Sequence, residues 1–405
     1  MKKKDILWVS LMAPYDNVGH ASGKTQNFYL KKLHDKEEYN IYLISFANCN
    51  IKEKVDLDKY NIKNKIFYYT WDGKAGRTMK WRSRFSKVNI WNRNAGLISP
   101  YYAECALKQM MQMKEKGYDP QIIIFQWTEI ALMLEKAKKI FPNAKTVIIE
   151  EDVSFLGHER KAEAESGIKK HFLRKKALRI KKREIELLNK SDLIILNNEK
   201  DRDLICNEIY DTDKIMVWCP YFQNMLPYKR KESNKNIIFF GAISRPENWK
   251  SIVWFIKNVW PLLKDEEIHF IIIGSNPPDV LKKYESDRIQ ITGFVEDIKL
   301  YFEESMCLVV PLVLGAGVKV KVLEGLSAGI PVLTNTIGIE GIPARDKEDF
   351  FFCETPNDYV DIIESLCAHK INTNSIEMNS KEFISHNFNY ENDVNQFQER
   401  LKQLL

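Results

Sequence analysis

The sequence lacks the features that mark several classes of protein. No apolar run approaches the about 18 residues that a membrane-spanning helix needs, and no internal repeat or low-complexity tract interrupts the chain. The seven cysteines form no CxxC pair, and the seven histidines show no HExxH spacing. These absences argue against collagen-like, disordered and integral-membrane proteins. They predict a reduced, cytosolic protein without structural zinc.

Charge of neither sign dominates. The 61 Lys and Arg residues against 55 Asp and Glu give a net charge of +6, which is mild for 405 residues and does not indicate a nucleic-acid coat. The length suits two domains of about 100–200 residues each. The start, MKKKDILWVSL, has a basic cluster but no small-residue cleavage site. We therefore interpret it as a first strand and not as a signal peptide.

Short runs rich in Val, Ile and Phe alternate with longer, helically patterned stretches. Runs of this kind, bounded by Gly or Pro, are typical of strands buried on both faces of a parallel sheet. The predicted strands are Ile6–Leu11, Ile41–Phe46, Ile66–Thr70, Ile122–Phe125, Thr146–Ile149 and Leu193–Leu196, then Ile237–Phe240, His269–Ile273, Ile289–Thr292, Leu308–Pro311, Val332–Thr334 and Phe350–Cys353. Two such series predict an α/β protein with two Rossmann-like, doubly wound domains.

The joint between the two series is predicted in Cys219–Asn236, which contains two prolines and no clean period. We predict an N-terminal domain over residues 1–220, a second domain over 221–388, and a C-terminal helix over 389–405 that packs back towards the N-terminal domain. Ligands of open parallel sheets bind beyond the carboxyl ends of the strands. Two sheets that face each other across a cleft can therefore hold two substrates between them.

The most informative loop follows the fourth strand of the second series. Gly315 and Gly317 lead into a helix predicted from about Val318 to Ala328, and a helix start presents free N–H groups that suit a diphosphate. Lys321 and Glu324 are three residues apart and share a helix face. A lysine there can balance phosphate charge, and a carboxylate can accept hydrogen bonds from ribose hydroxyls. The alternative is a simple helix-start turn with a surface Lys–Glu pair. The stretch fits neither the Rossmann fingerprint nor the Walker loop.

Four stretches occur in order between about Phe239 and Ile342: FFGAISRPENWKSIVWFIKNVWPLL, FIIIGSNPP, ITGFVEDIKLYFEES and GAGVKVKVLEGLSAGIPVLTNTIGIEGI. Together they resemble the donor-binding domain of GT-B glycosyltransferases, especially the retaining group called family 4. The N-terminal half matches more loosely. The resemblance implies transfer of a hexosyl or N-acetylhexosaminyl group from an NDP-sugar, with UDP favoured, to a hydroxyl of a glycan, lipid-linked or protein acceptor. It also implies retention of configuration, and no metal or other cofactor is expected.

The resemblance implies donor-site roles for particular residues. It implies that Glu324 binds the nucleotide ribose, that Lys321 binds the phosphates, and that Phe294 and Val295 line the nucleobase. The predicted donor-binding residues are Gly241, Arg245, Lys250, Gly274, Phe294, Val295, Gly315, Ala316, Gly317, Val318, Lys321 and Glu324. Two positions depart from the family pattern. Ala242 follows the glycine where relatives have arginine, and Ala316 stands where the first glutamate of the E-x7-E motif is expected.

The acceptor side is predicted in the first domain. Gly19, His20 and Lys24 lie in and after the loop that follows the first strand, where similar proteins approach the donor phosphates and the acceptor; a solvated loop histidine is the alternative for His20. Glu151 and Asp152 follow the fifth strand, where relatives carry a His-Asp pair. Such carboxylates can accept the acceptor's proton or cap the next helix. The predicted catalytic residues are Asp152, Glu151, Lys321 and Arg245, with His158 in reserve, and no obvious Asp-x-Asp metal site is expected.

Two basic stretches remain. Gly73–Asn94 interleaves aromatic residues with Arg and Lys, and Lys169–Arg183 contains nine Lys and Arg residues. Basic amphipathic segments suit anionic membrane surfaces. The sequence thus predicts a cytoplasmic protein with peripheral membrane contact through Lys169–Arg183, against the alternative of a solvated helix. Aromatic–basic interleaving also suits single-stranded nucleic acid, but no nucleic-acid partner is expected. The rival functions are a non-catalytic GT-B scaffold that binds a glycan or polypeptide, and a sugar-nucleotide epimerase.

Overall fold

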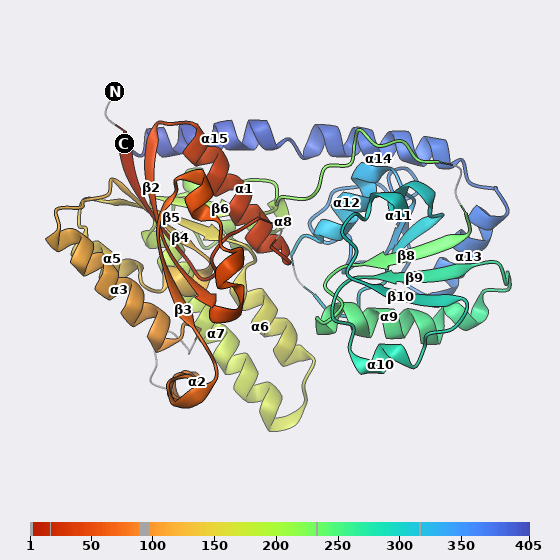
Figure 1. The fold of residues 1–405 in the computed structure, drawn as a ribbon, viewed down its shortest axis with the longest axis horizontal. Helices are drawn as coiled ribbons and strands as arrows, with labels where there is room; N and C mark the ends of the chain where they lie inside the picture. Colours follow the sequence, from red (N-terminus) through yellow and green to blue (C-terminus); the bar gives the residue numbers. More distant parts are fainter. Residues whose placement is uncertain (1–2, 17, 89–96, 232–233, 316) are drawn as a thin grey trace. The chain divides into compact units, whose positions relative to one another are not determined.

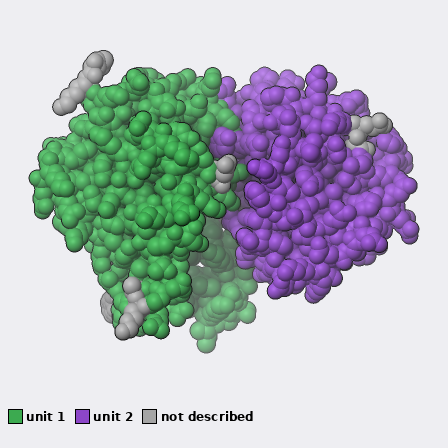
Figure 2. Space-filling model, in the orientation of Figure 1, with its two compact units in different colours: residues 1–219, 390–405 green, residues 220–389 purple. Residues whose placement is uncertain are grey.

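The structure is a computed structural model that describes residues 3–16, 18–88, 97–231, 234–315 and 317–405. The chain folds into two compact units, coloured separately in Figure 2. The first unit comprises residues 1–219 and 390–405, and the second comprises residues 220–389. The chain thus passes from one unit to the other after Cys219 and returns after Asn389.

The first unit is built on a seven-stranded sheet in the order β3-β2-β1-β4-β5-β6-β7 (Figure 1), and its paired strands are all parallel. The strands are β1 (Lys4–Ser10), β2 (Tyr39–Asn48), β3 (Lys63–Tyr69), β4 (Ile122–Gln126), β5 (Lys145–Glu150), β6 (Leu193–Leu196) and β7 (Ile215–Val217). The α-helices are α1 (Ala21–Asp35), α2 (Gly73–Val88), α3 (Pro100–Glu115), α4 (Thr128–Ala131), α5 (Leu134–Ile140), α6 (Ser154–Glu163), α7 (Gly167–Lys190), α8 (Glu199–Cys206) and α15 (Tyr390–Gln403). Short 3-10 turns are η1 (Cys49–Lys54), η2 (Leu57–Tyr60) and η3 (Thr212–Lys214).

The second unit carries a six-stranded sheet in the order β10-β9-β8-β11-β12-β13, again with parallel pairs only. Its strands are β8 (Asn236–Phe240), β9 (His269–Ile273), β10 (Ile289–Gly293), β11 (Cys307–Val310), β12 (Val332–Thr334) and β13 (Phe351–Phe352). Its helices are α9 (Pro246–Asn258), η4 (Trp260–Leu262), α10 (Asp279–Lys282), α11 (Lys299–Glu304), α12 (Val320–Ala328), α13 (Pro356–Cys367) and α14 (Thr373–Asn387).

The alternation of side chains along a strand explains why the sheets need helices on both faces. In β1, Leu7 and Val9 join one hydrophobic cluster while Ile6 and Trp8 join another on the opposite face. Helices α3, α5 and α7 contribute to the first cluster, and α1 and α15 contribute to the second. A strand that is apolar at every position is therefore stable only inside an α/β sandwich of this kind.

Each sheet has one topological switch point. In the first sheet β1 lies between β2 and β4, and in the second sheet β8 lies between β9 and β11. The connections on the two sides of such a point leave on opposite faces of the sheet, so a crevice opens beyond the carboxyl ends of the two strands. The topology thus directs attention to the loops after β1 and β4, and after β8 and β11.

The predicted fold class is confirmed, and every predicted strand overlaps a strand of the structure. Strand β7 was not predicted, because its three residues do not make a recognisable apolar run. The C-terminal helix α15 belongs to the first unit and contributes no strand to the second sheet. Val394, Phe397 and Leu401 of α15 are buried in the first unit, where the Phe397 ring meets the Trp218 ring edge-on at 5.2 Å between centroids. No helix of the described residues is long and apolar enough to cross a membrane.

Candidate functional site

At the switch point of the second sheet, side chains from α9 and α12 meet the backbone that follows β8. Gly241 follows β8 directly, and a Cβ atom at this position would lie 2.9 Å from Nζ of Lys321. The glycine therefore leaves room for an ammonium group against the main chain. Asn248 fixes that ammonium, because its Oδ1 accepts from Lys321 Nζ at 2.7 Å while its Nδ2 donates to the Ala242 carbonyl at 2.8 Å.

Lys321 is a cation without a counter-ion. Burial lowers its pKa to about 7, and the nearby positive charge of Arg245 acts in the same direction. Its ammonium lies 4.2 Å from the ring centroid of Phe239. No carboxylate of the described residues forms an ion pair with it, although the charges of Glu247 and Glu324 partly offset the shift. An anion next to this ammonium would favour its charged form.

Helix α12 begins two residues later than the sequence predicts. Lys319 is its N-cap residue and has an extended conformation, with φ −91° and ψ 93°. The Lys319 ammonium turns back and donates to the Gly317 carbonyl, and it lies 3.8 Å from Oε2 of the buried Glu340. The sequence predicts a helix from about Val318 to Ala328, and the structure has it from Val320 to Ala328.

Glu324 is buried on the inner side of α12 and does not form a surface pair with Lys321. Its Oε1 accepts from the Gln223 amide at 3.2 Å, and one turn further Ser327 Oγ accepts from the Met225 amide at 3.2 Å. The alternative of an exposed Lys–Glu pair is thus wrong. Glu324 also helps to raise the pKa of the half-buried Tyr221, after the larger effect of burial. Glu324 thus binds the backbone at Gln223, in the segment with which the second unit begins.

The loop that follows β11 is tied to helix α9. The Val313 amide donates to Ser251 Oγ at 3.1 Å, and the same hydroxyl donates to the Glu247 carbonyl at 2.6 Å. Gly315 and Gly317 lie in this loop with φ values of 146° and 70°. Val318 follows them before α12, and the predicted position Ala316 lies outside the described residues. The phosphate-loop candidates are thus attached to the helix that carries Asn248.

The other predicted donor residues lie at the ends of β9 and β10 and at the start of α9. Gly274 directly follows β9, and its amide donates to the Gly293 carbonyl at 2.8 Å. Phe294 and Val295 follow β10, and Phe294 is exposed. Arg245 is the N-cap residue of α9 and pairs with Glu247.

Lys250 lies apart from this group. It is exposed, with its ammonium 5.7 Å from the Trp249 ring centroid. It lies about 200° around α9 from Asn248, because a helix turns about 100° per residue. The structure therefore does not bring Lys250 to Lys321.

In the first unit, the loop after β1 ends at a capped helix. His20 is the N-cap residue of α1, and its Nδ1 accepts from the Gly23 amide at 3.0 Å. A Cβ atom at Gly23 would lie 2.5 Å from the His20 ring, so the glycine is needed for this cap. His20 is therefore a capping residue and not a freely solvated one. Gly19 precedes it, and Lys24 lies half-buried in the first turn of the helix.

Glu151 belongs to a buried hydrogen-bond network at the end of β5. Gln126 Nε2 donates to Glu151 Oε1, and Asn197 Nδ2 donates to Glu151 Oε2 at 3.0 Å. Both amides are oriented by indoles, because Trp8 Nε1 donates to Gln126 Oε1 at 3.2 Å and Trp218 Nε1 donates to Asn197 Oδ1 at 2.8 Å. An indole N–H can only donate, so each amide must turn its own N–H towards Glu151.

The predicted catalytic role of Glu151 therefore needs correction. Both of its oxygens are engaged inside the unit, and burial raises its pKa to about 8. Asp152 is exposed and is the one of the two predicted carboxylates that faces solvent. His158, held in reserve, is largely shielded, and burial together with neighbouring lysines lowers its pKa to about 4.

The carboxylate that caps helix α6 comes from a distant part of the sequence. Glu184 of α7 accepts from the Ser154 amide at 2.7 Å and from the Phe155 amide at 2.9 Å. Thr128 Oγ1 donates to Glu150, and it also lies 3.3 Å from Glu184 Oε1. Burial raises the pKa of Glu184 to about 7, and burial together with Glu184 raises that of Glu150 well above its usual range. The predicted alternative, a cap from the carboxylates after β5, is thus wrong.

Comparison with known proteins identifies the fold and a family match. Residues 234–369 match the sequence model of the family Glycosyl transferases group 1. HepE of Anabaena, solved with UDP, is 14% identical with a TM-score of 0.68 over 98% of this chain and 100% of its own. The fold is GT-B, and the match to the group 1 glycosyltransferase model falls within the second unit.

Two further relatives are similar to this chain. The sucrose-phosphate synthase of Thermosynechococcus elongatus is 14% identical with a TM-score of 0.69, over 99% of this chain and 99% of its own. An uncharacterised 44.6 kDa protein from the cps region of Klebsiella pneumoniae is 25% identical over 219 residues, which are 49% of this chain. The match spans 55% of the length of that Klebsiella protein.

Three residues of the glycosyltransferase domain were missed in the sequence. Asn248 was overlooked because nothing in its local pattern shows that it contacts a lysine 73 positions away. Lys319 was passed over in favour of Lys321, and Glu340 reaches Lys319 only through the fold. In the described residues, no group of three or more His, Cys, Asp or Glu side chains is placed to hold a metal ion.

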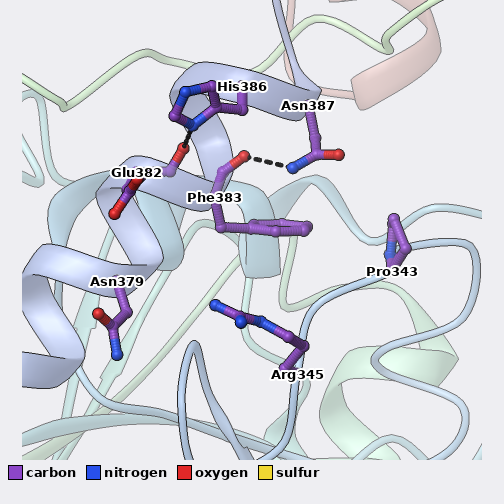
Figure 3. A pocket seen from close by; sticks show the side chains of 7 residues that line it. All are labelled: Pro343, Arg345, Asn379, Glu382, Phe383, His386 and Asn387. Atoms are coloured by element: carbon purple, nitrogen blue, oxygen red, sulfur yellow. Dashed lines mark hydrogen bonds between the residues drawn. The ribbon is translucent and has the colours of Figure 1, made fainter.

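A hollow of about 280 Å³ in the same domain lies away from the predicted donor residues. It is lined by the segment Pro343–Arg345 and by helix α14, from which Phe383 and His386 face it (Figure 3). The His386 ring bonds to the Glu382 carbonyl at 2.9 Å, and Asn387 Nδ2 donates to the Phe383 carbonyl at 2.8 Å. None of the predicted donor residues lines this hollow.

Proposed function

We propose that this chain is a glycosyltransferase that moves a sugar from a nucleotide-diphosphate donor to a hydroxyl acceptor. The observation that carries the proposal is the ammonium of Lys321, held by Asn248 against Gly241 at the switch point of a group 1 domain. An NDP-sugar brings a diphosphate, which is the anion that such a cation lacks. The exposed guanidinium of Arg245, close enough to depress the pKa of Lys321, supplies a second charge.

The chemical role proposed for these groups is stabilisation of the leaving group. As the bond from the anomeric carbon to the diphosphate oxygen breaks, negative charge grows on the phosphate while the sugar acquires oxocarbenium character. Preorganised cations and amide groups aimed at that charge stabilise the transition state more than the ground state. Lys321, Arg245 and the first amides of α12 provide them without a metal ion, and a closed site would protect the donor from water.

We propose that the transfer retains configuration through attack on the same face that the diphosphate leaves. The acceptor oxygen then bonds to the anomeric carbon, and its proton passes to the departing phosphate oxygen. The internal hydrogen bonds of Glu151 argue against its use as a nucleophile and leave Asp152 to orient the acceptor. Proton NMR of the product's anomeric signal tests this: retention is expected, and the opposite anomer would contradict it.

The proposed donor nucleotide is UDP, and a hexose or N-acetylhexosamine is the proposed sugar. HepE of Anabaena has been solved with UDP and with UDP-glucose, although its 14% identity supports the fold alone. A thermal-shift screen of UDP, GDP, ADP and their common sugars tests the choice. A bound nucleotide at about a hundredfold excess over its Kd stabilises by about 2.7 kcal/mol. We expect UDP to raise the unfolding temperature and GDP and ADP to leave it unchanged. A rise with GDP or ADP but not with UDP would show that the donor nucleotide is not UDP. No rise with any of the three would contradict the enzyme assignment.

The proposed acceptor is a glycan, lipid-linked saccharide or protein. The cps-region origin of the Klebsiella relative favours a role in capsule synthesis. A cytoplasmic site of action is proposed because the seven cysteines are free thiols, which is usual in a reducing compartment. Incubation with a radiolabelled UDP-sugar and a membrane extract of the host, followed by extraction into organic solvent, distinguishes a lipid-linked acceptor from a soluble glycan.

Donor binding is expected to take up a proton above pH 7. The pKa of Lys321 is about 7 in the empty site, and a bound diphosphate favours the charged form and raises it. Affinity should therefore be highest below pH 7 and should weaken by up to tenfold per pH unit above it. Calorimetry at pH 8 in two buffers of different ionisation enthalpy measures the uptake, which should approach one proton per donor molecule.

The Lys321→Met variant is the control for this measurement. It should bind the donor more weakly and with no buffer dependence, because the titrating group is gone. An uptake that persists in the variant would assign the proton to another group. An uptake of zero in the wild type would mean that Lys321 is already charged in the empty site.

A further inference from the structure

Helix α2 of the first unit exposes a pair of aromatic side chains. Trp81 and Phe85 are 65% and 57% exposed, and their rings stack on one another with centroids 5.9 Å apart and planes 14° from parallel. Stacking covers one face of each ring and leaves the rest in water. Two large aromatic residues one helical turn apart form an apolar patch that the described part of the unit does not cover.

The patch is bordered by cations. Six of the sixteen residues of α2 are Lys or Arg, and none is acidic. Arg82 pairs with Glu104 of α3, but Arg77, Lys80 and Arg84 form no ion pair with the described residues. At about 100° per residue, these three side chains lie on the face of α2 that carries Trp81. The aromatic patch thus lies next to positive charge that no described residue of the unit neutralises.

A second patch of the same kind lies at the start of α7. Ile168 is 91% exposed and Phe172 is 49% exposed. Lys175 lies with them inside an arc of about 60°, and it too has no ion pair among the described residues. The cations on the adjoining side of the helix are engaged by carboxylates at the end of α6 and in the α6–α7 turn. These pairs are Lys170 and Arg174 with Glu163, and Lys169 with Glu165.

The segments that carry the two patches project at the same edge of the first unit (Figure 1). Figure 1 shows α2 and the turn between α6 and α7 projecting at the lower edge of this unit. Both segments belong to the first compact unit. A flat surface can touch both at once, whereas a single nucleic-acid strand needs a groove lined with stacking platforms. The shape and the charge therefore favour a flat anionic partner.

We propose that α2 and the start of α7 dock the first unit on a bilayer that contains anionic lipid. Trp81, Phe85, Ile168 and Phe172 enter the interfacial layer, which aromatic side chains prefer. Arg77, Lys80, Arg84 and Lys175 meet the negative headgroups. This surface uses no residue assigned to the donor site, so the docking and the proposed transfer can fail independently of each other.

Vesicle co-sedimentation with the full chain tests the docking. At least tenfold more protein should sediment with vesicles of phosphatidylcholine and phosphatidylglycerol than with phosphatidylcholine alone, and this excess should disappear in high salt. Trp81→Ser/Phe85→Ser and Ile168→Ser/Phe172→Ser should each reduce binding by about tenfold. Arg77→Gln/Lys80→Gln/Arg84→Gln should abolish the preference for anionic lipid.

A matched control removes two exposed apolar side chains from the second unit, Leu262→Ser/Met378→Ser. It should bind vesicles as the wild type does, and all variants should keep the wild-type thermal unfolding because the altered side chains are exposed. The proposal is overturned by a wild type that ignores anionic vesicles, or by aromatic variants that bind like the control. Tighter binding to a single-stranded oligonucleotide than to the vesicles, at equal salt, also overturns it.

Discussion

Lys321→Met is expected to lower the rate of sugar transfer by a factor of about 10² to 10³, the usual cost of removing one well-aimed donor of transition-state stabilisation. The ammonium is held at 2.7 Å by Asn248, beside a glycine that leaves the space open. Methionine fills a similar volume without the charge. The measurement is single-turnover transfer from the donor selected by thermal shift, at saturating acceptor.

The folded state should tolerate this substitution. A half-buried lysine whose pKa is depressed to about 7 costs stability at neutral pH, so the loss of its charge should leave the thermal unfolding temperature unchanged or slightly raised. Lys257→Met is the matched control, because Lys257 is an exposed residue near the end of α9 in the same domain. Full activity in Lys321→Met, or an equal loss in Lys257→Met, would contradict the assigned role.

Asn248 offers a graded version of the same experiment. Asn248→Ala leaves the lysine in place and removes the group that holds it, so transfer should fall by a smaller factor than in Lys321→Met. If Asn248 acts only through Lys321, the double variant should be no slower than Lys321→Met alone, since contacting residues are not additive.

The fold was predictable because its strands carry an unusually plain signal. β4 is buried at all five positions. A continuous apolar run of this kind is typical of a parallel strand that helices cover on both faces of the sheet. The C-terminal helix α15 was placed outside the second sheet from its position after the last predicted strand. β7 was missed because three residues at a sheet edge carry too little pattern.

The site was predictable only where its residues stand in one local motif. Gly315, Gly317 and Lys321 follow one another in a strand–loop–helix segment, and their relation can be seen in the sequence. Asn248 and Glu340 reach this segment from other helices and loops, through packing that no local pattern records.

The same limit applied in the first unit, where the residues after β5 suggested either catalysis or a helix cap. The cap belongs to Glu184, which lies 30 residues further along the chain from the amide of Ser154. Glu151 is instead fixed by amides that two indoles orient. Which carboxylate serves which purpose is decided by long-range hydrogen bonds that local sequence cannot specify.

Gly274→Ala is expected to destabilise the second unit by about 3 kcal/mol or more. The new Cβ atom would lie 1.9 Å from the Gly241 carbonyl oxygen and 2.8 Å from the Ile243 side chain, and the backbone has φ +149°, which side-chain-bearing residues rarely adopt. Overpacking against a neighbour costs about 1–3 kcal/mol and a strained backbone a similar amount. Urea unfolding followed by circular dichroism measures the loss.

The clash also predicts a loss of donor binding, because the atom that must move is the carbonyl of the glycine that accommodates Lys321. Gly293→Ala separates the two causes. It lies at the end of the neighbouring strand with φ +72°, but a Cβ atom there would meet nothing within 4 Å. Gly293→Ala should lower the free energy of unfolding by about 1–2 kcal/mol, the cost of a left-handed backbone conformation alone. If the two variants unfold alike, the contact between Gly241 and Gly274 does not define the crevice, and the position of Lys321 must be fixed by Asn248 alone.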